Sequence, residues 1–190
     1  MLNPIRERKL SHLFHILDRN HDGVLSRQDF EQVIEEITNI RQWKWGTSEY
    51  EELHFFWMGF CNRLEVWADR NGDGKVTESE WLWYLEQMLD RFSASYIQQA
   101  FINISLKVMD FSRDDRVSLD EFKQFYQIYE IDPQEAAQAF VHLDLNQDGY
   151  LTKDELTSLF QEFFLQRKSS VSWELVMGKY RWITKIQLIL

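Results

Sequence analysis

Residues Asp69–Glu80 read D-R-N-G-D-G-K-V-T-E-S-E, and the spacing of oxygen-bearing groups in this stretch decides the fold. Ca2+ takes about six to eight oxygen ligands, and a loop between two helices can supply most of them. Gly74 stands sixth, where the sharp turn needs a residue that tolerates positive φ. The ligand positions (first, third, fifth, seventh, ninth and twelfth) hold Asp69, Asn71, Asp73, the carbonyl of Lys75, Thr77 and Glu80. An acidic turn without metal is the alternative, but the complete match predicts a helix–loop–helix calcium site, the EF-hand.

Three further stretches repeat this pattern, and we call the four loops hands I to IV in chain order. Hand I, Asp18–Asp29, ends on Asp29 where hand II has Glu. An Asp is one methylene shorter and offers fewer oxygens, which suits the octahedral shell of Mg2+. The sequence therefore predicts a site of mixed Mg2+ and Ca2+ character. Its ligand positions hold Asp18, Asn20, Asp22, the carbonyl of Val24, Ser26 and Asp29.

Hand IV, Asp144–Glu155, satisfies every position of the pattern as hand II does. A Gly again stands sixth and a Glu twelfth, which predicts a full calcium site. Its ligand positions hold Asp144, Asn146, Asp148, the carbonyl of Tyr150, Thr152 and Glu155.

Hand III, Asp110–Glu121, departs from the pattern at two positions. Asp115 replaces the sixth-position Gly, at a cost of roughly 1 kcal/mol for a left-handed backbone. Ser112 supplies a weaker third oxygen than Asn. We expect the weakest site here, so the count is three to four Ca2+; the alternative is a degenerate loop that only braces hand IV. The ligand positions hold Asp110, Ser112, Asp114, the carbonyl of Arg116, Ser118 and Glu121.

The eighth loop position is apolar in all four hands: Leu25, Val76, Val117 and Leu151. Paired hands join these residues in a short two-stranded bridge that satisfies the backbone groups and buries the side chains. The sequence thus predicts an all-α fold of two packed EF-hand pairs. We place hands I and II in residues 1–92, hands III and IV in 93–168, and a separate C-terminal segment in 169–190.

Apolar spacing predicts helices over about 29–41, 48–68 and 153–166, and one that ends near residue 92. The second has a broad apolar face of Leu53, Phe56, Trp57, Phe60, Leu64 and Trp67. Asp132, Pro133 and Glu135 form a helix start, as N-cap, first and third residues. Such aromatic stripes are more often core than ligand pocket, and an aromatic core is harder to open than the Met-lined groove of a calcium sensor.

Composition excludes several classes of function. A formal net charge of −10 argues against nucleic acid as a partner. The single Cys excludes an internal disulfide and suits a reducing compartment. Met1–Lys9 does not resemble a secretion signal, and no stretch of 18 apolar residues could span a bilayer. Outside the loops there is no nucleophile–base motif, so we expect a cytoplasmic protein that is not an enzyme.

The chain resembles the sarcoplasmic calcium-binding proteins of invertebrates and the bacterial, calerythrin-like members of that family. The resemblance covers about residues 3–178. It depends on the four hands with a long first interval, on Asp29, on the helix 133–140 (P-Q-E-A-A-Q-A-F) and on Trp173–Gly178. It implies a compact fold of two EF-hand pairs that buffers Ca2+ and Mg2+, with one hand defunct in many members.

Calcium-triggered photoproteins share this architecture and are a rival. Their His, Tyr and Trp side chains hold a peroxidised luciferin, and the family's pocket positions fall near Leu10, Phe160, Phe164 and Met177 here. These residues lack the hydrogen-bonding groups that would anchor the luciferin, which disfavours light emission.

The remaining features leave a choice between a buffer and a sensor. We expect a monomeric Ca2+/Mg2+ buffer; the alternative is a sensor that exposes an apolar surface to a partner or membrane. The cationic and apolar tail 179–190 either docks on the protein or binds a partner or a membrane surface. His12 and His15 are close enough in sequence for a metal pair but lack a third ligand, and Cys61 is expected to be an inert buried thiol.

Overall fold

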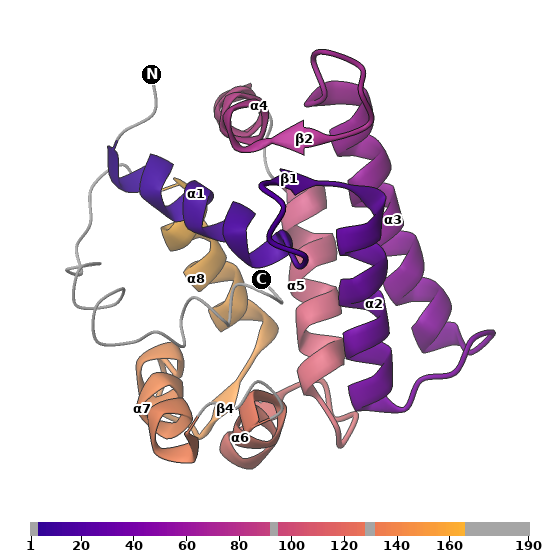
Figure 1. The fold of residues 1–190 in the computed structure, drawn as a ribbon. Coiled ribbons are helices and arrows are strands. Elements are labelled where there is room, and N and C mark those ends of the chain that lie inside the picture. The colour runs from indigo at the N-terminus through magenta and orange to yellow at the C-terminus, as the bar shows by residue number, and fades with distance from the viewer. Residues whose placement is uncertain (1–3, 92–94, 128–131, 166–190) are drawn as a thin grey trace. The chain divides into compact units, whose positions relative to one another are not determined.

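The computed structural model describes residues 4–91, 95–127 and 132–165 of the 190-residue chain (Figure 1). These residues form an all-α fold, as the sequence predicts, with only short two-residue strands in the loops. The chain divides into two compact units, Met1–Ala94 and Ser95–Leu190, and each is described by itself. Within the described residues no helix is long and apolar enough to cross a membrane.

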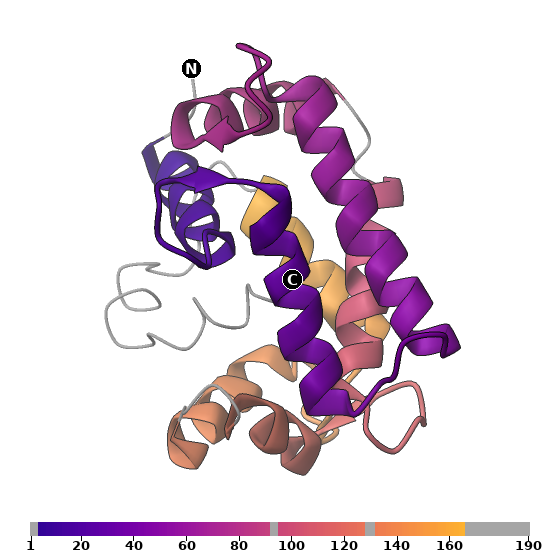
Figure 2. The ribbon, with the colours of Figure 1, turned by 45° about the vertical axis from the view of Figure 1, so that its right-hand side comes forward.

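Unit 1 contains hands I and II, each with a helix on either side of its loop. Helix α1 (Pro4–Leu17) leads into hand I and α2 (Arg27–Arg41) leaves it, while α3 (Ser48–Trp67) and α4 (Glu78–Arg91) flank hand II. Helix α2 packs along α3 and α1 packs against α4. The long α2–α3 pair is visible in Figures 1 and 2. The outgoing helix of one hand thus covers the incoming helix of the other.

Unit 2 repeats this arrangement with hands III and IV. Helices α5 (Ser95–Met109) and α6 (Leu119–Gln127) flank hand III, and α7 (Pro133–Leu143) and α8 (Lys153–Leu165) flank hand IV. Helix α6 packs on α7 and α5 on α8. The C-terminal segment 169–190 lies outside the described residues.

Two antiparallel bridges join the loops within each unit. Strand β1 (Val24–Leu25) pairs with β2 (Val76–Thr77), with Leu25 opposite Val76. Strand β3 (Val117–Ser118) pairs with β4 (Tyr150–Leu151), with Val117 opposite Leu151. All four eighth-position side chains are buried. The predicted pairing of hand I with II and of III with IV is therefore present.

Helix boundaries follow local capping. Helix α2 begins at Arg27, two residues before the sequence-based estimate, because Asp29 accepts a hydrogen bond from the Ser26 amide at 2.9 Å. Helix α7 begins as expected, with Asp132 as the N-cap and Pro133 as the first residue. The Asp132 side chain accepts a hydrogen bond from the Gln134 amide at 2.7 Å.

The core of unit 1 is aromatic. Trp57, Trp81, Phe14 and Phe30 are fully buried. The Phe30 and Trp57 ring centroids lie 6.1 Å apart. The indole nitrogen of Trp81, on α4, donates to the Leu10 carbonyl of α1 at 2.8 Å. In unit 2, three aromatic side chains of α6 are fully buried: Phe122, Phe125 and Tyr126.

The buried face of α3 is rotated from the predicted one. Trp67 is 65% exposed, so its assignment to the core is wrong. The buried positions recur every three to four residues along a face that ends on Cys61 and Ala68 rather than on Trp67. Along this face they are Leu53, Trp57, Cys61, Leu64 and Ala68, and Met58 beside it is also buried.

Candidate metal centres

The first residue of each loop is held by the amide of the sixth. The Asp69 Oδ2 atom accepts from Gly74 N–H at 2.8 Å, and Asp18 and Asp144 accept from Gly23 and Gly149 at 2.9 and 2.8 Å. The sixth residue adopts positive φ in each of these loops, between 77° and 86°. A left-handed backbone points this amide inward, which is why Gly suits the position.

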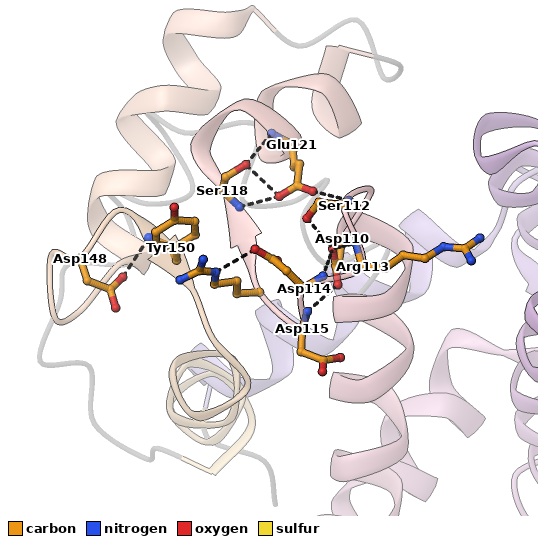
Figure 3. A network of polar contacts seen from close by, with 10 residues as sticks. Asp110, Ser112, Arg113, Asp114, Asp115, Ser118, Glu121, Asp148 and Tyr150 are labelled. Carbon is orange, nitrogen blue, oxygen red and sulfur yellow. Dashed lines mark hydrogen bonds and ion pairs between the residues drawn. The ribbon is translucent and has the colours of Figure 1, made fainter.

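Hand III builds the same contact without a Gly. The Asp115 amide donates to Asp110 Oδ2 at 2.9 Å, and Asp115 itself has φ of 64° (Figure 3). The substitution that distinguishes this loop in sequence therefore leaves its turn unchanged in form, although at the energetic cost of a Cβ in the left-handed region.

The twelfth residue closes each loop by accepting hydrogen bonds from loop amides. Glu80 accepts from the amides of Arg70 and Thr77 at 3.1 and 2.9 Å. Asp29, although shorter, accepts from the corresponding amides of Arg19 and Ser26 at 3.0 and 2.9 Å. Asp29 is 1% exposed. The shorter carboxylate of hand I therefore makes the same two amide contacts as the Glu of hand II.

The fifth-position carboxylates are oriented by a neighbouring donor, and hand III uses a different one. In hands I, II and IV the third-position Asn amide donates to Oδ2 of the fifth-position Asp, at 3.2, 3.0 and 3.0 Å. In hand III the Ser112 hydroxyl donates to Asp110 Oδ1 at 3.2 Å. The Oδ2 atom of Asp114 accepts instead from Arg116 Nε at 2.9 Å (Figure 3).

Hand III also brings its carboxylates together. Asp110, Asp114 and Glu121 each offer an oxygen, and these oxygens lie within 4.8 Å of one another. Because Ca2+–oxygen distances are about 2.3–2.6 Å, two ligands of one ion lie at most about 5 Å apart. Among the described residues this is the one group of three acidic or His/Cys side chains that meets this criterion. The donor set fits a divalent cation, and the expectation that hand III is the weakest site stays a prediction.

The loop amides stabilise ionised carboxylates. Donation from the Thr77 amide is the largest effect that lowers the pKa of Glu80. Desolvation would raise the pKa of Asp69 and of Glu121, but the loop amides outweigh it and both lie below their usual values. The Arg116 side chain holds the pKa of Asp114 low, with a smaller contribution from Ser112. In hands II and III these hydrogen bonds therefore favour the ionised carboxylates that a cation requires.

Comparisons with known proteins agree with this geometry. The EF-hand family model matches residues 10–34, 68–82 and 137–161, which contain hands I, II and IV. Calmodulin-like protein 2 of Arabidopsis thaliana is 31% identical over 114 residues, which are 57% of this chain and 70% of that protein. The chain belongs to the EF-hand family. Calerythrin of Saccharopolyspora erythraea is 26% identical over 170 residues, 88% of this chain and 96% of calerythrin.

Solved structures share the fold of this EF-hand protein. A sarcoplasmic calcium-binding protein from amphioxus superposes with a TM-score of 0.73 at 20% identity, over 94% of this chain and 98% of that one. Calcium-loaded apo-aequorin from Aequorea victoria gives 0.68 at 17% identity, over 89% and 95%. At these identities the likeness shows the fold alone. With the family match and the relatives, the chain is a calcium-binding EF-hand protein similar to calerythrin and the sarcoplasmic proteins.

The other candidate residues of this EF-hand protein do not form a second centre. Burial, together with the nearby His15, lowers the pKa of His12. His15 Nε2 lies 3.8 Å from Glu78. Cys61 is a buried free thiol, and burial raises its pKa to about 12. A thiol with so high a pKa has little thiolate at neutral pH and is a poor nucleophile.

The photoprotein pocket positions are only partly described. Leu10 is buried, and its carbonyl is the acceptor for Trp81. The side chains of Phe160 and Phe164 and the whole of Met177 lie outside the described part of the structure.

Two features of the loops were not foreseen from the sequence. The fourth position also has positive φ in every hand: His21, Gly72, Arg113 and Gln147. Gly72 is the only sequence signal for it. The second feature is the contact of the Arg116 side chain with Asp114. The loop pattern assigns a role only to the backbone carbonyl of Arg116. Loop spacing cannot show where a long side chain folds back.

Proposed function

We propose that this EF-hand protein is a monomeric, cytoplasmic buffer of Ca2+ and Mg2+ with no enzymatic activity. The ions would be held by the six ligand positions of each hand given above, in three or four sites. A sarcoplasmic calcium-binding protein of Penaeus is among the relatives, and the loop hydrogen bonds that favour ionised carboxylates in hands II and III support ion binding.

The observation that carries the buffer assignment is the closed aromatic core of unit 1. Sensors of the calmodulin type open a helix pair to expose a Met-rich groove. Here Met58 is buried on α3, and Trp57 and Trp81 fill the space between helices. Opening the helix pairs of this unit would expose the buried Trp57 and Trp81 side chains. Each buries about 150–250 Å2, which makes opening expensive.

A sensor is the second candidate, because some apolar surface is already exposed. Phe55 and Val66 on α3 are 78% and 68% exposed. Titration of Ca2+ in the presence of a hydrophobic dye separates the two functions. A buffer should show dye fluorescence that is flat or falls with Ca2+, whereas a marked rise would favour a sensor and overturn the proposal. Incubation with coelenterazine and oxygen, followed by Ca2+, tests light emission.

Mg2+ binding in hand I is proposed from Asp29. Its carboxylate is one methylene shorter than that of Glu80 yet reaches the corresponding amides of Arg19 and Ser26. A short carboxylate that supplies fewer oxygens suits the octahedral shell of Mg2+, with bonds of about 2.0–2.1 Å. Reciprocal variants test this: Asp29→Glu in hand I and Glu80→Asp in hand II.

Calorimetric titration with Ca2+, with and without Mg2+, reads out both variants. We expect Mg2+ to compete at one site in the natural protein, at none in Asp29→Glu and at two in Glu80→Asp. If Mg2+ competition is unchanged in both variants, the assignment of Mg2+ selectivity to the twelfth residue is wrong. The same titration counts the sites: a stoichiometry of three would leave hand III empty.

A further inference from the structure

The donor to the fifth-position carboxylate differs in only one hand. Three hands use an Asn two residues earlier, and that Asn is itself a ligand position. Hand III has Ser112 there, whose hydroxyl donates to Asp110 and contributes less than Arg116 does to the low pKa of Asp114. The Asp114 oxygen that an Asn would hold accepts from Arg116 instead. The Arg116 side chain therefore reaches the same atom, Oδ2, from the opposite side along the loop.

The same guanidinium group of Arg116 also contacts hand IV. Its guanidinium carbon lies 3.8 Å from the centroid of the Tyr150 ring. Tyr150 is on β4 and pairs with Ser118 of β3, so the bridge between the hands sets this contact. Asp148, the fifth residue of hand IV, also contributes favourably to the charge on Arg116. In Figure 3, Tyr150 lies between Asp148 of hand IV and the labelled residues of hand III.

We propose that Arg116 is a positioning residue for hand III, which holds Asp114 for the ion and is itself held by Tyr150 of hand IV. This inference rests on the proposed function, because it assumes that hand III binds an ion. In the other hands the Oδ1 atom of the fifth-position carboxylate accepts from the seventh-position amide. The backbone amide of Arg116 also donates to Asp114, so Arg116 holds this carboxylate through both its amide and its side chain. The seventh-position carbonyl of Tyr150 is a proposed ligand of hand IV. An ion there would fix the residue that anchors Arg116, so binding in hand IV should favour binding in hand III.

An alternative role for Arg116 predicts the opposite effect. If Arg116 acted as a resident cation that competes for Asp114, its removal would tighten hand III. A positioning role predicts weaker binding, because outer-shell partners of metal ligands typically change affinity by about 10- to 100-fold when removed.

The test uses the full chain and three variants in unit 2. Arg116→Ala removes the donor, and Arg116→Ala with Ser112→Asn restores a local donor of the kind that the other hands use. Lys153→Ala is the matched control, because it removes one exposed positive charge from the same unit without touching a ligand position. Amide resonances of Asp115 and Gly149, followed by NMR during Ca2+ titration, report on hands III and IV separately.

We expect Arg116→Ala to weaken hand III about 10-fold, and to reduce its dependence on hand IV. The Ser112→Asn change should restore most of the affinity, and Lys153→Ala should change it less than about 2-fold, since exposed charges are well screened. Unchanged or tighter binding in Arg116→Ala, or no rescue by Ser112→Asn, overturns the inference while ion binding stands. An Asp115 amide that does not respond to Ca2+ in the natural protein overturns the proposed site in hand III as well.

Discussion

At the scale of single residues, the sixth position of hand III shows how much a loop can tolerate. Asp115 makes the same amide contact as the three Gly residues, but does so at φ of 64°. Replacement by Gly should remove the strain of a Cβ in the left-handed region, worth about 1 kcal/mol. We therefore expect Asp115→Gly to stabilise unit 2 of the ion-free protein by about this amount in denaturant unfolding.

The substitution also removes a negative charge from an acidic loop, so a control is needed. Asp115→Asn removes the same charge and keeps a side chain at positive φ. If the Asn variant is as stable as the Gly variant, the gain comes from charge and the backbone argument fails.

Side-chain type and spacing predict the ligand positions of the four loops, and the structure places these residues in loops between helices. Spacing could not show the Arg116 contact, because that contact depends on Tyr150, 34 positions away and brought near only by the β3–β4 bridge. The prediction that Trp67 is buried is wrong for a similar reason, because burial depends on which helix packs against α3. Helix α3 has apolar residues on two adjacent faces, one with Cys61 and one with Trp67. The face with Cys61 is buried, and α3 packs against α2.

At the scale of elements, the two-residue bridges are the joints between hands. Leu151 on β4 is buried against Val117 on β3. Truncation to Ala should leave a cavity and cost about 2–5 kcal/mol. We expect Leu151→Ala to destabilise unit 2 and to weaken hands III and IV together, as measured by unfolding and Ca2+ titration.

Leu145 provides a matched Leu-to-Ala control in the same loop, because it is 55% exposed. Leu145→Ala should change the free energy of unfolding by less than about 0.5 kcal/mol. Equal losses from both variants would show that the bridge has no special role.

The carboxylates of the loops should also make the stability of the ion-free protein depend on acidic pH. The pKa of Glu80, lowered first by the Thr77 amide, and that of Glu121 lie below their unfolded values near 4.5. For a depressed carboxyl pKa, the stabilisation is complete above the unfolded value and is lost as pH falls through the folded one. We expect the free energy of unfolding to fall as pH drops below about 4.5, measured by denaturant titration without metal.

The variant Glu80→Gln isolates one contribution to this acid limb. Gln keeps an oxygen for the Thr77 amide but cannot titrate in this range. Its stability should depend less steeply on acidic pH than that of the natural protein, and an unchanged slope would mean that other groups control the acid response.

At the scale of the whole molecule, the repeat of the loop pattern determined most of the architecture. Four helix–loop–helix motifs with an apolar eighth residue allow few arrangements, and the pairing of neighbours satisfies every bridge. The helix ends differ from the sequence estimates by one or two residues, because caps such as Ser26 act locally. The exposed edge of α3 depends on tertiary packing, which periodicity alone does not specify.

Ion binding should stabilise the two units separately, and the natural Trp residues can report it. Six of the eight Trp residues, at positions 43, 45, 57, 67, 81 and 83, lie in Met1–Ala94. Trp fluorescence during unfolding therefore reports mainly on unit 1.

An ion at about 1,000 times its dissociation constant stabilises the folded state by about 4 kcal/mol per site. Glu80→Gln should remove one such increment from the Trp-detected transition, since Glu80 closes hand II. Glu155→Gln, the same change in hand IV, should leave that transition almost unchanged and instead lower a transition detected by amide resonances of unit 2. Equal shifts of the Trp-detected transition in both variants would show that the two units unfold as one and that ion binding in either stabilises the whole chain.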